Sequence, residues 1–169
     1  MSAAEPPGLF PDEPAGPPGL LYQRDLLSGE QEAALAAAIA ELELKPFEFH
    51  GFLGKRRVVS FGWRYVFDGS GLTEAEPIPA FLLPLRERAA RFAGVDPQAF
   101  VHMLVTEYAP GASIGWHKDR SVFGDTIGVS LLSDCRLRFR RRSAHGGERA
   151  ALIPAPAPPF LLRAAARPL

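Results

Sequence analysis

The feature that most constrains the fold of this chain is a change in hydrophobic periodicity near residue 98. Before this point, apolar side chains recur every three or four residues, which is the spacing of one helical face. After it, apolar and polar residues alternate, which is typical of β-strands. Helices followed by strands predict an α+β chain in which the helices support an antiparallel sheet or barrel.

Two helices are predicted before the change in periodicity. The first begins at Ser28, an N-cap residue with Gln31 at the spacing of a capping box. The second begins near Pro79 and ends at Gly94, because glycine is favoured just past the end of a helix. The apolar residues that share one helical face are Leu35, Ile39 and Leu42 in the first helix, and Leu82, Leu85, Ala89 and Phe92 in the second.

Three strands are predicted after the change, at residues 100–108, 126–132 and 135–141. The second and third are separated by Ser133 and Asp134, so we expect them to form a hairpin. Two shorter, proline-bounded segments are further strand candidates: 151–153 and 160–163.

The charges of the chain are unevenly distributed, although its 169 residues have a formal net charge of zero. Residues 1–50 carry two basic and nine acidic side chains, a net charge of −7, and residues 51–169 carry 17 basic and 10 acidic ones, a net charge of +7. Such a split indicates contact with nucleic acid, and an unevenly charged, solvated surface is the alternative. A chain of this length is expected to form one domain with its own core.

The first 19 residues contain six prolines and three glycines, which predicts a flexible leader rather than a helix or strand. They lack the basic and apolar regions of a signal peptide, and no run in the chain approaches the roughly 18 apolar residues of a membrane span. Cys135 is the only cysteine, so one chain cannot form a disulfide framework or a cysteine zinc site. We therefore expect a cytoplasmic protein that has no membrane partner.

His117 and Asp119 form an H-x-D pair within the segment GWHKDR. In an extended segment, residues two apart point to the same side, so an imidazole and a carboxylate reach one metal ion. Non-haem Fe(II) oxygenases use two histidines and one carboxylate in this way, with the opposite face of the iron open. The pair alone also fits a structural role, in which Asp119 accepts a hydrogen bond near a turn.

Longer segments around this pair resemble one known family. The segment YAPGASIGWHKD, residues 108–119, is followed by FGDTIGVSL at 123–131 and CRLRFRRR at 135–142. Upstream, KRRVVSFGWRY at 55–65 is similar to a nucleotide-recognition region. From about Leu20 to Arg142, the chain resembles the AlkB-like Fe(II)/2-oxoglutarate-dependent dioxygenases.

The resemblance implies a mainly β, double-stranded β-helix (jelly-roll) core with two supporting N-terminal helices, in a domain at 20–169 that follows the leader at 1–19. His117 and Asp119 would be the first two iron ligands, and the cofactors would be Fe(II), 2-oxoglutarate and O₂. Tyr108 matches a tyrosine that hydrogen-bonds 2-oxoglutarate. Thr106 stands where many relatives have asparagine, and its hydroxyl donates with a shorter reach.

The resemblance also implies how a nucleic acid would bind. Trp63 and Tyr65 lie in the segment that covers a flipped base, and ordinary packing of alternating aromatic side chains is the alternative. Two basic clusters would contact phosphates, and a charged strand edge that prevents aggregation is the alternative. The clusters are Lys55, Arg56 and Arg57, and Arg136, Arg138, Arg140, Arg141 and Arg142.

The chain departs from the family pattern at its end. The family has a second histidine and then an arginine for 2-oxoglutarate after a segment that 159–169 resembles at its start. No histidine follows His145, which lies in a glycine-rich turn, a poor place for a ligand that faces a barrel interior. Arg163 and Arg167 precede the expected histidine, so the arginine role is not assigned to them. On this interpretation the last core strands are missing: either the domain is truncated, or a partner or a second copy covers the open edge of the sheet.

The resemblance predicts oxidative dealkylation of alkylated nucleobases in DNA or RNA. An N-alkyl group would be hydroxylated and would leave as an aldehyde. Two other functions stay open: a catalytically degenerate nucleic-acid-binding relative, and a 2-oxoglutarate oxygenase that acts on a protein or a small molecule.

Overall fold

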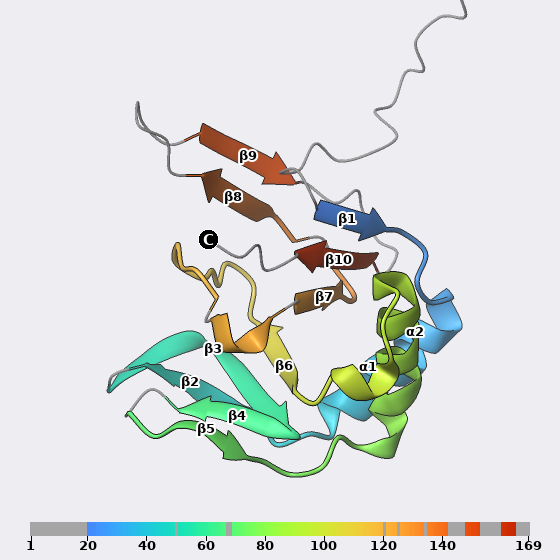
Figure 1. Cartoon of the computed structure of the whole chain (residues 1–169), viewed down its shortest axis with the longest axis horizontal. Coiled ribbons are helices and arrows are strands. Elements are labelled where there is room, and N and C mark those ends of the chain that lie inside the picture. Colours follow the sequence, from blue (N-terminus) through green and yellow to red (C-terminus); the bar gives the residue numbers. More distant parts are fainter. Residues whose placement is uncertain are drawn as a thin grey trace, which may run out of the picture. The chain divides into compact units, whose positions relative to one another are not determined.

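The computed structural model (Figure 1) describes residues 20–49, 51–66, 69–119, 121–124, 126–133, 135–141, 148–152 and 160–164. The predicted leader at 1–19 lies outside them. The described residues form two compact units, one made of residues 27–124 and the other of residues 20–26 and 126–164. None of the helices in the described ranges is long and apolar enough to cross a membrane.

In the unit of residues 27–124, helix α1 spans Gly29–Ala40. Its start confirms the predicted capping box. The backbone N–H of Gln31 donates to Ser28 Oγ at 3.2 Å, and the backbone N–H of Ser28 donates to Gln31 Oε1 at 3.1 Å. These two bonds satisfy two donors that a helix terminus otherwise leaves without partners. The helix therefore begins where the local sequence places it.

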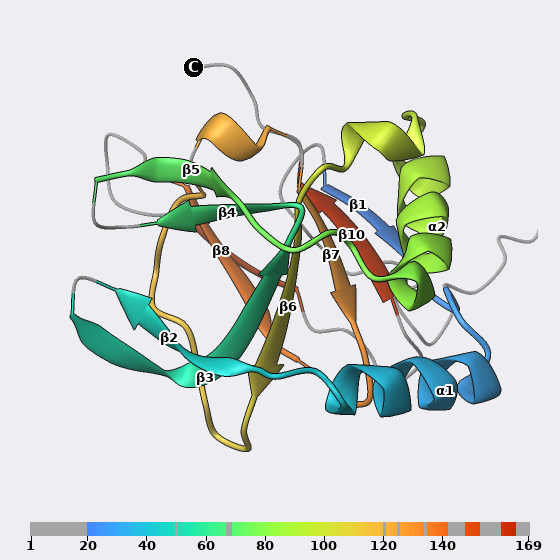
Figure 2. The same ribbon diagram turned by 90° about the horizontal axis from the view of Figure 1, so that it is seen from below.

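Helix α2 spans Leu83–Ala93 and is preceded by a 3-10 turn, η1, at Ala80–Leu82. It ends at Gly94, whose φ of 69° is left-handed and whose N–H donates to the carbonyls of the last helical turn. The predicted end is confirmed, whereas the α-helix begins at Leu83, after a 3-10 turn that follows the predicted start at Pro79. Arg88 Nη2 donates to Gln31 Oε1 at 3.4 Å, which joins α2 to α1 (Figure 2). The side chains that α2 and η1 bury are Leu82, Ala89, Ala90 and Ala93.

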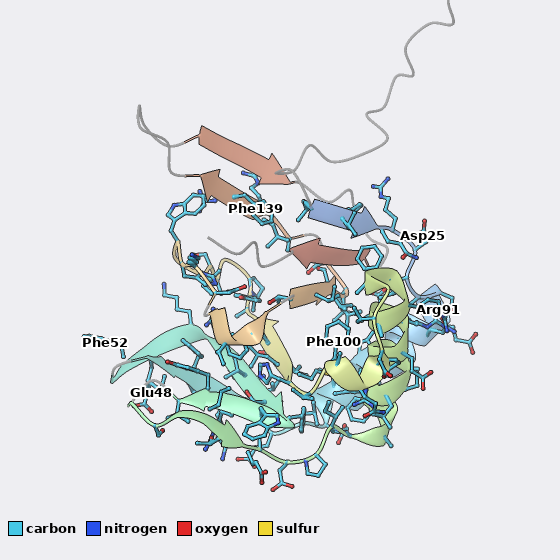
Figure 3. The ribbon with its side chains drawn as sticks, in the orientation of Figure 1. Asp25, Glu48, Phe52, Arg91, Phe100 and Phe139 are labelled. Atoms are coloured by element: carbon cyan, nitrogen blue, oxygen red, sulfur yellow. The ribbon has the colours of Figure 1, made fainter. Side chains whose placement is uncertain are left out.

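The same unit contains an antiparallel sheet with the strand order β2-β3-β6. These strands span Lys45–Phe49, Phe52–Phe61 and Met103–Tyr108, and β3 lies between the other two (Figure 2). Glu48 and Phe52 lie at the outer end of the β2–β3 hairpin (Figure 3). After η2 at Pro97–Ala99, β6 begins three residues later than the predicted strand.

A second hairpin pairs β4 at Trp63–Val66 with β5 at Gly71–Glu74. In the sequence, strands β2 to β5 come between helices α1 and α2. The predicted order, with helices first and strands later, is therefore wrong. Much of β2 and β3 is exposed, and cations and glycine interrupt the alternation of apolar residues in β3. Periodicity is a weak signal for such strands.

Gly62 joins β3 to β4 in a position that only glycine fits. Its φ is 74°, and a Cβ on it would lie 2.0 Å from the carbonyl oxygen of Val101. Its N–H donates to the Glu76 carbonyl at 2.7 Å, and its own carbonyl accepts from the Ala75 N–H at 3.0 Å. These two bonds join the beginning and the end of the β4–β5 hairpin, and the close approach to Val101 places the beginning of that hairpin beside the chain just before β6.

The unit of residues 20–26 and 126–164 contains β1 (Leu20–Gln23), β7 (Thr126–Ser130), β8 (Leu137–Arg141), β9 (Glu148–Leu152) and β10 (Phe160–Ala164). One antiparallel sheet has the order β1-β10-β7, and β8 pairs with β9. Partly buried side chains pack in one cluster: Leu20, Tyr22, Cys135, Leu137 and Phe139 (Figure 3).

Strands β7, β8 and β10 lie where the sequence predicts them, β9 begins three residues before the predicted segment 151–153, and β1 was not predicted. The predicted hairpin of residues 126–132 with 135–141 is wrong. β7 pairs with β10 and β8 pairs with β9. The dipeptide Ser133–Asp134 lacks the glycine that two-residue hairpins favour, and Leu132 takes a left-handed φ of 70° before it. The partner of β7 is therefore β10, a strand far away in the sequence, and not the next strand, β8. Within the described ranges, the strands form antiparallel sheets without closing into a barrel.

Replacing Gly62 with alanine tests the close approach to Val101. We expect Gly62→Ala to lower the free energy of unfolding by about 2–5 kcal/mol, because both a left-handed Cβ and a clash with backbone are introduced. Gly94→Ala is the matched control, since Gly94 has a similar φ of 69° but nothing within 4 Å of an added Cβ. We expect it to cost about 1–2 kcal/mol. Equal losses in urea titrations of the two variants would contradict the clash.

Candidate metal centre

His117 and Asp119 lie in an irregular loop, residues 109–119, between the end of β6 and the 3-10 turn η3 at Ser121–Phe123. The structure brings the two side chains together. His117 Nε2 is 3.4 Å from Asp119 Oδ1, and the side chains are 53% and 59% exposed. The pair therefore presents both donor atoms side by side and leaves room around them.

The tautomer of His117 follows from its second nitrogen. Nδ1 is 2.9 Å from the carbonyl oxygen of Gly115. A carbonyl only accepts hydrogen bonds, so Nδ1 carries the hydrogen and donates. Nε2 is then the ring atom that faces the Asp119 carboxylate, and it is the donor atom that a metal ion would use. Metal-bound histidines commonly use such a carbonyl bond on the other nitrogen to fix their orientation.

The two donor atoms fit a first-row divalent metal ion. With metal–donor bonds of about 2.1 Å, atoms 3.4 Å apart subtend an angle of about 108° at the ion. An imidazole nitrogen and a carboxylate oxygen are the donor types of non-haem Fe(II) sites. In the described parts of the chain, no group of three or more His, Cys, Asp or Glu side chains could hold a metal. His145 and Arg167 lie outside those parts, and Arg163 is in β10, where only the backbone is described.

Thr106 and Tyr108, the residues predicted to bind 2-oxoglutarate, are both on β6 and share one face of the strand. Their cross-strand neighbours on β3 are Val58 and Arg56. Tyr108 is 46% exposed and stands at the start of the loop that carries His117. A phenol and a hydroxyl are therefore available as hydrogen-bond donors next to that loop.

The first predicted basic cluster does not form one patch. Side chains alternate along β3, so Lys55 and Arg57 share one face and Arg56 lies on the other. The Arg56 guanidinium carbon lies 3.9 Å from the centre of the Phe47 ring, a cation–π contact.

Arg57 pairs with Glu107 across the sheet. Its Nε and Nη2 donate to Glu107 Oε1 and Oε2 at 3.0 Å and 2.6 Å. This bond raises the pKa of Arg57 and lowers the pKa of Glu107. The pair links β3 to β6, so Arg57 has a structural contact as well as a charge.

The second predicted basic cluster belongs to the other unit. Arg136 and Arg138 are exposed, and the β8–β9 register places Arg140 opposite Arg149. Arg142 lies outside the described residues.

Trp63 and Tyr65, the predicted stacking residues, share one face of β4. Trp63 is 37% exposed, whereas Tyr65 is partly buried and contacts Phe123 edge-on, with ring centres 6.1 Å apart and an angle of 64°. The Phe123 ring also stacks on His102, at 5.2 Å and 22°. Tyr65 thus packs against Phe123, and Trp63 keeps an exposed face.

Sequence reasoning missed Phe123 and His102. The available signal was position: Phe123 begins FGDTIGVSL, four residues after Asp119, and His102 directly precedes β6. Burial without a charged partner lowers the pKa of His102 below its ordinary value of 6.5. The neutral ring is therefore the form that stacks on Phe123.

A comparison with protein families agrees with this chemistry. The model of the 2OG-Fe(II) oxygenase superfamily matches residues 19–157, which is most of the chain. The chain belongs to this superfamily. Its members have a jelly-roll fold, are dioxygenases and use Fe(II), 2-oxoglutarate and O₂. A search of curated proteins finds no match. Membership of this superfamily implies a dioxygenase reaction.

The lowered pKa of His102 predicts a stability loss in mild acid. Above about pH 6.5 the His102 ring is neutral in both the folded and the unfolded chain, so its protonation does not reduce the free energy of unfolding there. As pH falls below this value, the unfolded chain binds a proton that the folded chain does not, so the free energy of unfolding falls. We expect urea titrations at pH 7.5 and 5.5 to show a smaller loss for His102→Gln than for the wild type. Equal losses in the variant and the wild type would contradict the prediction.

Proposed function

We propose that this chain is an Fe(II)/2-oxoglutarate-dependent dioxygenase that oxidatively dealkylates alkylated nucleobases. The observation that carries the proposal is the facing pair of His117 Nε2 and Asp119 Oδ1, 3.4 Å apart and exposed, in a member of the 2OG-Fe(II) oxygenase superfamily. The aromatic face of β4 and the arginines of β8 and β9 favour a nucleic-acid substrate over a small molecule.

His117 and Asp119 would hold the iron, which together with 2-oxoglutarate and O₂ supplies the oxidation of an N-alkyl carbon that then leaves as an aldehyde. The Gly115 carbonyl accepts from His117 Nδ1 and keeps the Nε2 lone pair directed at the site. Asp119 contributes a negative charge that balances part of the charge of the metal. Both side chains are about half exposed, so positions for the cosubstrates stay open.

Tyr108 and Thr106 would bind the cosubstrate. The half-exposed phenol of Tyr108 donates a hydrogen bond to a carboxylate or keto oxygen, and the hydroxyl of Thr106 is a second donor on the same face of β6. Because Tyr108 also begins the loop that carries His117, a cosubstrate bound to it stays next to the metal pair.

Trp63 and Tyr65 would bind the substrate base. Enzymes that act on a base in a duplex take it out of the stack and hold it against aromatic side chains. Trp63 has an exposed ring for this contact, and Tyr65 is held in place by Phe123. A base on this face of β4 gains stacking with little loss of side-chain freedom.

The arginines of β8 and β9 would contact phosphates. Arg140 and Arg149 occupy opposite positions, where like charges favour an anionic partner. Lys55 is exposed and is available in the same way, while Arg57 is bonded to Glu107.

Removing either proposed ligand tests the enzyme. Purified wild-type protein, loaded with Fe(II) and 2-oxoglutarate, should form succinate and formaldehyde with methylated single-stranded DNA. We expect His117→Ala and Asp119→Ala to lower this rate by at least about 100-fold, because one donor cannot hold the ion in place. Ser113→Ala, an exposed position of the same loop, is the control. Wild-type succinate formation at background would refute the proposed activity.

Replacing the arginines of β8 tests the substrate class. We expect Arg140→Ser/Arg141→Ser/Arg142→Ser to weaken binding of single-stranded DNA and to reduce the salt dependence by about 0.7 in slope for each lost phosphate contact. Arg91→Ser, at an exposed cation on α2 (Figure 3), should change neither quantity. Unchanged turnover in the triple variant would instead favour a protein or small-molecule substrate. DNA binding without turnover would identify a non-catalytic relative.

A further inference from the structure

The loop at 109–119 contains hydrogen bonds within itself. The Ala112 N–H donates to the Ala109 carbonyl at 2.9 Å, and His117 Nδ1 bonds the Gly115 carbonyl at 2.9 Å. These bonds lie within the loop and shape it. The loop follows Tyr108, the last residue of β6, and η3 begins soon after it ends. How η3 is held is therefore one constraint on the position of the metal pair.

Phe123, the last residue of η3, is held by two aromatic rings from different elements. Its ring stacks on His102 at 5.2 Å and 22°, and it meets Tyr65 of β4 at 6.1 Å and 64°. Both geometries are among those that aromatic pairs favour. His102 is partly buried and its pKa is lowered by burial, so its neutral ring is the partner. The Phe123 side chain thus connects η3, which follows the loop at 109–119, to β4 through Tyr65 and to the segment before β6 through His102.

Gly62 explains why these two rings lie close together. It joins β3 to β4 and lies so close to the Val101 carbonyl that a Cβ would be 2.0 Å away. Tyr65 is three residues after Gly62, and His102 directly follows Val101. The backbone contact brings both neighbours of Phe123 to the same place, and the ring of Phe123 lies against both.

We propose that Phe123 is the positioning residue of the metal pair. Its ring, seated on His102 and Tyr65, sets where the loop ends and so aligns His117 and Asp119 with the aromatic face of β4. Phe123 itself contacts neither the metal nor the substrate. The inference rests on the proposed function for the metal, but the geometry it requires is present in the metal-free protein.

The first experiment needs no metal. Nitrogen–proton correlation spectra of the imidazole at pH 8 report which ring nitrogen of His117 carries the hydrogen. We expect the Nδ1–H tautomer in the wild type and a mixture of tautomers in Phe123→Ala, because the loop loses its attachment. Val122→Ala, at the exposed neighbour in η3, and Phe123→Tyr, which keeps the ring, should both retain the wild-type spectrum. A wild-type spectrum in Phe123→Ala would overturn the proposal.

The second experiment measures Mn²⁺ affinity by calorimetry in the same variants. Losing two aromatic contacts should weaken binding roughly tenfold in Phe123→Ala and leave Phe123→Tyr unchanged. His117→Ala should bind no Mn²⁺. Wild-type protein that binds no Mn²⁺ would refute the metal site itself, whereas the tautomer spectra would still decide the role of Phe123. Equal affinity in wild type and Phe123→Ala would overturn the positioning role alone.

If Phe123→Ala does not fold, substitutions of His102, whose ring stacks on Phe123, test the same contact. His102→Ala removes one ring from the other side of the contact, and His102→Phe keeps a stacked ring. We expect His102→Ala to mix the His117 tautomers and His102→Phe to preserve the single one. The reverse result would contradict the proposal, because the effect would then follow the imidazole and not the stacking. Thermal unfolding of each variant confirms that the folded protein is compared.

Discussion

The pairing of β3 with β6 is the interaction on which the rest of the unit of residues 27–124 depends. Six cross-strand pairs join the two strands, and the Arg57–Glu107 ion pair lies across them. This pairing sets the face of β6 that presents Thr106 and Tyr108. It also determines where the loop at 109–119 leaves the sheet, directly after Tyr108. Gly62, which follows β3, determines where β4 begins. The proposed metal centre, cosubstrate donors and stacking face are thus all positioned relative to these two strands.

The electrostatics of the metal pair add a second constraint. The Gly115 carbonyl accepts from His117 Nδ1, so Nε2 is the ring atom that faces Asp119 Oδ1. These are the two atoms that a metal ion would bind, and the superfamily match implies an iron site. The half-exposed position of the pair leaves space for a cosubstrate and a substrate.

Local signals predicted the helices well. Ser28 with Gln31 and the glycine at 94 act on backbone groups within one turn, so neighbouring residues suffice to place both boundaries. Strands β2 to β5 were missed because their exposed residues and interrupted alternation leave no clear period. The partner of β7 was also wrong, since β10 lies about 30 residues away in the chain and no local pattern encodes that pairing.

The sequence by itself determined the chemistry of the site: the H-x-D spacing places an imidazole and a carboxylate on one side of an extended segment, and the surrounding segments indicate an oxygenase family. Only the tertiary structure decided the rest. The Gly115 carbonyl selects the tautomer of His117, Glu107 binds Arg57, and Phe123 lies between rings from residues 65 and 102. Most of these contacts join residues far apart in the chain. Their geometry depends on which strands pair, and hydrophobic periodicity does not specify pairing.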